Sequence, residues 1–140
     1  MIQRIQTLFL LLAAVAAGAS LCGHWTNIAP ECNALLAFGT NWASSIFIAA
    51  TVLLIFATIF FYKKRKIQLN LCIVDIILIV GFYICYAVEY FRLTKLIAEN
   101  QSLTPSFFVF TPLIALVFIV LAMKNIKKDE NLIRSLDRLR

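Results

Sequence analysis

Four apolar stretches, each about 20 residues long, constrain the fold of this chain more than any other feature. They run from about residue 5 to 25, 43 to 62, 67 to 88 and 106 to 123. At a rise of ~1.5 Å per residue, each is long enough for one helical crossing of a bilayer. Lipid offers no partner to open backbone groups, so helices are expected for all four. We predict an all-α membrane protein, a four-transmembrane-helix bundle that forms a single integral membrane domain over residues 1–140.

The composition excludes most other classes. Hydrophobic residues make up 62% of the chain and charged residues 14%, whereas soluble domains are about one quarter charged. An ordinary soluble enzyme, a disordered tail and a disulfide-rich secreted module are therefore excluded.

The first stretch has two interpretations. Arg4, the apolar run from residue 7 to 18 and the small residues 17–19 resemble a cleavable secretory signal. The apolar stretch continues to Trp25 without a break, which favours retention as a first span.

The basic residues predict the topology. Arg4, the run 63–66 and six residues after Met123 lie on one side of the predicted spans, whereas Arg92 and Lys95 lie on the other. The positive-inside rule then places both termini in the cytoplasm. The net charge of +6 is a topology signal, and nucleic-acid binding is not predicted.

Small residues suggest how the helices pack. Ala14 and Gly18 in the first span, and Ser45 and Ala49 in the second, are each four residues apart on one helix face. Such pairs allow close helix contact within the chain or, alternatively, at a homodimer seam. Spans two and three are joined by so few residues that they must form an antiparallel hairpin.

Three residues predict where the helix of the fourth span begins and where it bends. Thr104 is expected to cap it and Pro105 to occupy its first helical position. Pro112 is expected to kink the segment from inside. Trp25 and Trp42, with several neighbouring aromatic residues, are expected to form an interfacial belt.

Asp75 is the most informative polar residue. It lies about 9 Å inside the third span, where an unpaired carboxylate is costly. Tyr86 falls near the same helix face, and Thr58 in span two is expected at a depth from which it can donate to Asp75. The functional interpretation is a proton- or cation-binding carboxylate. The structural alternative is a hydrogen-bonded, protonated or lysine-paired Asp75 that fixes the helix register.

The four cysteines and the single histidine predict little chemistry. Cys22 and Cys32 flank the outer loop and are candidates for a disulfide. The chain has no C-x-x-C motif, which disfavours a membrane thiol oxidase. His24 lies near both cysteines, but the spacing matches no metal template. No catalytic residue, metal site or cofactor is predicted.

The segment 124–140 is predicted to be a cytoplasmic amphipathic helix. Its apolar residues recur at near-helical spacing among basic and acidic ones. One interpretation is attraction to membrane lipids; the other is docking onto a protein partner. The candidate docking residues are Ile126, Leu132, Ile133, Arg134, Leu136, Arg138 and Leu139.

Three segments resemble a known family. The opening MIQRIQTLFLLLAA, the central KKRKIQLNLCIVDIILIVGFY and the closing IKKDENLIRSLDRLR are similar to the domain of unknown function 4293 family. The resemblance covers nearly the whole chain and implies a small four-span bacterial inner-membrane protein with a retained first span. It implies no activity, substrate or cofactor. The loop with Cys22, His24 and Cys32 is not part of the family pattern.

These observations favour a non-enzymatic accessory or scaffold subunit that engages a membrane or cytoplasmic partner through its C-terminal tail. The expected partners are membrane lipids and, in the inner membrane, a protein partner or further copies of this chain. The alternative is a small transporter or ligand-binding bundle centred on Asp75, with Tyr86 and the expected kink at Pro112.

Overall fold

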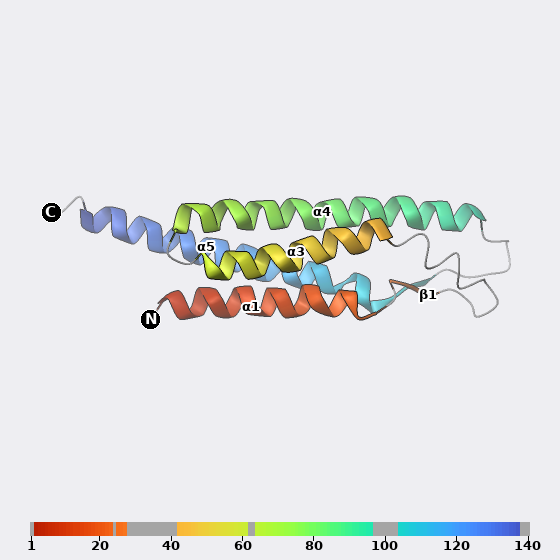
Figure 1. Cartoon of the computed structure of the whole chain (residues 1–140), viewed down its shortest axis with the longest axis horizontal. Helices are drawn as coiled ribbons and strands as arrows, with labels where there is room; N and C mark the ends of the chain where they lie inside the picture. The colour runs from red at the N-terminus through yellow and green to blue at the C-terminus, as the bar shows by residue number, and fades with distance from the viewer. Residues whose placement is uncertain (1, 24, 28–41, 62–63, 97–103, 138–140) are drawn as a thin grey trace.

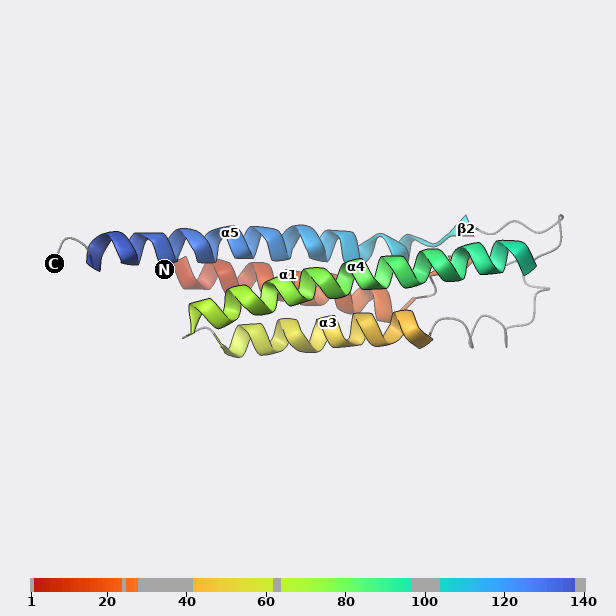
Figure 2. The same cartoon turned by 90° about the horizontal axis from the view of Figure 1, so that it is seen from above.

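The computed structural model describes residues 2–23, 25–27, 42–61, 64–96 and 104–137. Within these residues, four α-helices run alternately up and down: α1 (Ile2–Leu21), α3 (Trp42–Phe60), α4 (Arg65–Leu96) and α5 (Thr111–Asp137). Two short strands, β1 (Thr26–Asn27) and β2 (Thr104–Pro105), pair antiparallel, and a 3₁₀ turn, η1 (Phe107–Val109), precedes α5. Figures 1 and 2 show an elongated bundle. The predicted fold class, a helical bundle, is confirmed.

The two ends of the bundle differ. The first described residues of α1, the start of α4 and the end of α5 lie together at what we call the terminal end (Figure 1). The paired strands lie at the opposite end, which we call the strand end. The predicted hairpin of spans two and three is confirmed, because α3 ends at Phe60 and α4 begins at Arg65.

The outward faces of the helices are apolar. Val15, Leu53, Ile84 and Val117 are each more than half exposed, which is unusual for a water-soluble protein of this size. Three described helical segments are long and apolar enough to cross a membrane: Trp42–Phe60, Lys66–Lys95 and Phe107–Leu132. The apolar part of α1, Ile5–Leu21, is shorter but lies along α5 and α3. The structure thus has the character of a membrane protein, and a crossing by α1 stays a prediction.

Small residues bring α1 against α5. Ala13, Ala14 and Ala17 are buried and share one core cluster with Ala115 and Ala122 of α5. Alanine faces let two backbones approach closely, which is the main source of packing energy between helices in lipid. Packing within the chain is therefore confirmed for the alanines of α1, whereas the space beside Gly18 holds no heavy atom within 4 Å of an added Cβ.

The fourth helix begins later than expected. Thr104 and Pro105 belong to β2 rather than to a helix, and α5 begins only at Thr111. Pro112 therefore lies in the first turn of α5, where no backbone N–H is needed. The expected kink at Pro112 is wrong, because the helix starts at this proline instead of running through it.

A matched pair of glycines tests this packing. A Cβ on Gly81 of α4 would lie 2.9 Å from Cε1 of Phe47. We expect Gly81→Ala to lower the free energy of unfolding by about 1–3 kcal/mol through overpacking. Gly18→Ala is the control and should be neutral or stabilising by about 0.5–1 kcal/mol, because alanine favours the helix. Thermal unfolding in detergent measures both. Equal effects of the two substitutions would contradict the close α3–α4 contact.

Candidate polar site in the bundle core

Asp75 is buried without a hydrogen-bond partner. Its side chain has no exposed surface, and it lies one turn from Cys72 and one turn from Ile79 on α4, both members of the main core cluster. Neither carboxyl oxygen has a hydrogen-bond partner among the described residues. A buried polar group without a partner is rare and needs an explanation. Asp75 is therefore the primary candidate site.

Thr58 does not donate a hydrogen bond to Asp75. Its hydroxyl donates to the carbonyl oxygen of Leu54 at 2.7 Å, as the hydroxyl of Thr51 does to Phe47 at 2.8 Å. Threonine in an apolar helix commonly satisfies its hydroxyl in this way, on the carbonyl one turn earlier. The hydrogen bond expected from Thr58 to Asp75 is therefore absent, although both side chains are fully buried.

Tyr86 lies on the same face of α4 as Asp75 but is not brought to it. The two residues are three helical turns apart, about 16 Å, and Phe82 lies between them. The Tyr86 hydroxyl donates to the carbonyl oxygen of Trp25 at 3.5 Å. Its ring stacks on Phe82 with a centroid distance of 6.3 Å. Tyr86 therefore belongs to a separate cluster at the strand end.

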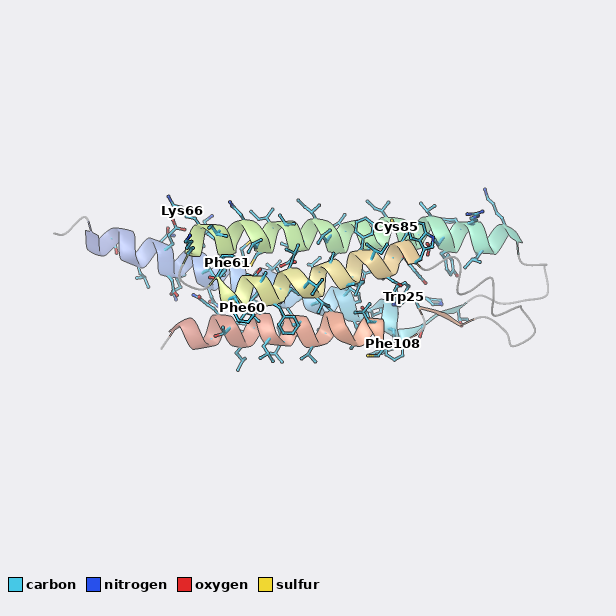
Figure 3. All side chains as sticks on the ribbon, viewed as in Figure 1. Trp25, Phe60, Phe61, Lys66, Cys85 and Phe108 are labelled. Atoms are coloured by element: carbon cyan, nitrogen blue, oxygen red, sulfur yellow. The ribbon has the colours of Figure 1, made fainter. Side chains whose placement is uncertain are left out.

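That cluster also contains Phe47, Ile48 and Val109; we call five of its aromatic residues the aromatic plug, namely Trp25, Phe82, Tyr83, Tyr86 and Phe108. Phe82 is fully buried and meets the Trp25 ring edge-on at 5.3 Å and the Tyr83 ring at 5.1 Å. Figure 3 shows Trp25 and Phe108 together where α1 ends. A Cβ on Gly23 would overlap the ring of Phe108, so only glycine fits there.

Hydrogen bonds hold the plug in place. The Trp25 indole N–H donates to the Ser20 carbonyl at 2.8 Å, and the Tyr83 hydroxyl donates to the Val109 carbonyl at 2.7 Å. The assignment of Trp25 to an interfacial belt is therefore wrong, because only 4% of it is exposed. Trp42 is 66% exposed, as a belt residue should be.

Two further polar contacts lie at the ends of the bundle, and sequence reasoning missed both. At the terminal end, Nε2 of Gln6 donates to Oδ2 of Asp129, and both side chains are buried. At the strand end, the buried hydroxyl of Ser44 donates to Oε2 of Glu89 at 3.3 Å. The one available signal was that Asp129 lies three residues after Ile126, on the same helix face.

The tail residues divide into two groups. Ile126 is fully buried in the main core cluster, so its assignment to a docking surface is wrong: α5 continues as a packed helix past Met123. Leu132 is 48% exposed. The backbone of Ile133, Arg134 and Leu136 is helical, and their side chains, like residues Arg138 and Leu139, lie outside the described part.

The cysteines form no site that the structure describes. Cys22 is exposed, and its Sγ lies 3.7 Å from the Gly18 carbonyl oxygen. Cys32 and His24 lie outside the described residues, so the disulfide stays a prediction. Among the described residues, no group of three or more His, Cys, Asp or Glu side chains is placed to hold a metal ion.

Three comparisons with known proteins give one match. A family model described as a domain of unknown function (DUF4293) matches residues 2–139, nearly the whole chain. Comparison with the curated proteins and with the solved structures finds no match. The chain therefore belongs to the DUF4293 family of domains of unknown function.

Proposed function

We propose that this chain is a non-enzymatic, four-span protein of the bacterial inner membrane that acts as an accessory or scaffold subunit. Both termini lie in the cytoplasm, and the C-terminal part of α5 engages a protein partner. Membrane lipids surround the bundle, and nucleic acid is not a partner.

The observation that carries this proposal is the length of α5. The helix continues without a break to Asp137, about 12 Å past the contact of Asp129 with Gln6. Figures 1 and 2 show this segment projecting at the terminal end. This segment continues a packed helix, and Leu132 is an exposed apolar side chain on it.

The basic residues support the cytoplasmic placement of this end. Lys64, Lys66, Lys124, Lys127 and Lys128 are all exposed and belong to the start of α4, the turn before it, or the distal half of α5. Lys66 is labelled at this end in Figure 3. Basic residues next to membrane spans are retained on the cytoplasmic side.

The burial of Ile126 and Asp129 determines which truncation tests the proposal. Removal of residues 132–140 spares both side chains, so the bundle should still fold. We expect full-length protein, purified from native membranes in mild detergent, to retain a stoichiometric partner that the truncated chain loses. Leu132→Ser should weaken this capture, and Asn131→Ser, at the neighbouring exposed position, is the matched control. Purification of all forms alone as the same oligomer would contradict the proposal.

A small transporter or ligand-binding bundle centred on Asp75 is the second candidate function. The unpartnered carboxyl in the core favours it. The transporter hypothesis also relied on a kink at Pro112. Pro112 lies in the first turn of α5, so this argument for a transporter is lost. Asp75→Asn should impair such a function and spare partner capture, whereas truncation at residue 132 should do the reverse.

A further inference from the structure

We infer that Asp75 is a proton-binding site that exchanges its proton with the terminal end of the bundle and is closed to the strand end by the aromatic plug. This inference deepens the second candidate function, because it names the ligand and the side from which the ligand enters. The accessory role does not depend on it.

The surroundings of Asp75 select a proton over a metal cation. A metal ion needs several ligands at once, and the described residues contain no group of three or more His, Cys, Asp or Glu side chains placed to hold one. A proton needs one carboxyl oxygen and no further charge. Proton binding converts the carboxylate and one hydronium ion into a neutral acid and water, and release reverses this step.

Among the described side chains, none on another helix supplies a cation to pair with a charged Asp75. The sequence of α3 contains no ionisable side chain, and Arg4 is the single ionisable residue of α1. On α5, the ionisable residues begin at Lys124, which is exposed, and Asp129 is engaged by Gln6. On α4, the neighbour one turn away is Cys72. A carboxylate left unpaired in an apolar core is costly, so the neutral acid is the form that this core accommodates.

The path from Asp75 to the strand end is apolar. Ile79 and Phe82 follow it on the same face of α4, and both are fully buried. Phe82 is about 10 Å away and is covered by the rings of Trp25 and Tyr83. Glu89 lies beyond this plug and accepts a hydrogen bond from Ser44. Neither Ile79 nor Phe82 offers water a hydrogen-bond partner on this face of α4.

On the terminal side of Asp75, the same face of α4 carries a thiol and an amide in place of apolar groups. Cys72 and Gln68 lie one and two turns from Asp75 on the same face of α4, and both are buried. Gln68 is also about 10 Å from Asp75, and its amide can donate to and accept from water. Gln6 and Asp129 lie at this same end. A short file of water entering here has the Gln68 amide as a hydrogen-bond partner, whereas Ile79 and Phe82 on the other side of Asp75 offer none.

Dicyclohexylcarbodiimide tests the proton directly. The O–H of a carboxylic acid adds across one C=N bond of this reagent, and the product rearranges to a stable N-acylurea without any redox step. We expect mass spectrometry of wild-type protein in sealed vesicles to find this adduct on Asp75. The adduct should be lost in Asp75→Asn, while circular dichroism and elution volume stay unchanged. Glu89→Gln should retain it.

The side of entry is tested with a pH difference across vesicles of known orientation. The yield of adduct should rise as the pH on the terminal side falls and should not respond to the pH on the strand side. Phe82→Ala should make it respond to both. Absence of the Asp75 adduct at every pH in the folded wild-type protein, or a yield that follows the strand side, would overturn the inference. Failure of transport alone would overturn the second candidate function and leave proton binding intact.

Discussion

Replacement of Phe82 by alanine should lower the free energy of unfolding by about 3–5 kcal/mol, the range for removing a buried aromatic ring. Phe82 is fully buried and contacts three rings, those of Trp25, Tyr83 and Tyr86. These rings come from α4 and from the segment after α1, so the cavity would loosen the contact between them. Edge-on and offset ring pairs add about 0.5–1.5 kcal/mol beyond their buried area.

The matched control for Phe82 is Ile84, two residues further along the same helix. Ile84 is 61% exposed on the outward face, so Ile84→Ala removes few contacts within the chain. We expect it to change the free energy of unfolding by less than ~0.5 kcal/mol. Unfolding in mixed detergent micelles, followed by tryptophan fluorescence, measures both variants. A similar small effect of the two substitutions would show that the rings at the strand end do not stabilise the bundle.

The helices were predictable because their signal is local. Runs of apolar residues with few charges require helices in lipid; α3 follows its predicted span closely, and α4 begins within two residues of its predicted start. The turn between them is constrained by its short length alone. In contrast, α4 extends to Leu96, eight residues past the predicted end at Val88, because helix continuation beyond the apolar run has no hydropathy signal.

The interior contacts were not predictable because they depend on residues far apart in the sequence. The position of Trp25 at a predicted membrane boundary suggested a belt. The pairing of β1 with β2, however, brings Ser106 next to Trp25, and the Ser106 N–H donates to the Trp25 carbonyl at 2.9 Å. That pairing also delays the start of α5 and places Pro112 in its first turn. The side of a helix on which a tryptophan lies follows from these tertiary contacts and not from its own neighbours.

The candidate site was predictable in part. Asp75 stands out from the sequence because a lone acid in an apolar run is unusual, and its burial agrees with that expectation. Its lack of a partner could not be predicted, since Thr58 was near in depth and chemically suited to donate. The hydroxyl of Thr58 bonds its own helix instead, a choice that depends on the side-chain rotamer.

Loss of the contact between Gln6 and Asp129 should be the second large effect. These residues are 123 positions apart in the sequence and join the start of α1 to the distal part of α5. Gln6→Met keeps the size of the side chain but removes the donor to a buried carboxyl group. We expect it to lower the free energy of unfolding by about 1.5–3 kcal/mol, the range for a hydrogen bond to a charged group.

Asp129→Leu in the Gln6→Met background should restore most of this loss. The double substitution leaves neither position with a buried polar group that lacks its partner, and replacing both members of a buried polar pair by apolar groups is often neutral. Leu8→Met, on the outward face of α1 where Leu8 is 57% exposed, should have little effect. A double-mutant cycle measured by thermal unfolding gives the coupling energy. Additive losses from the two single substitutions would mean that Gln6 and Asp129 do not stabilise each other, and α5 would then lack this support beneath its projecting segment.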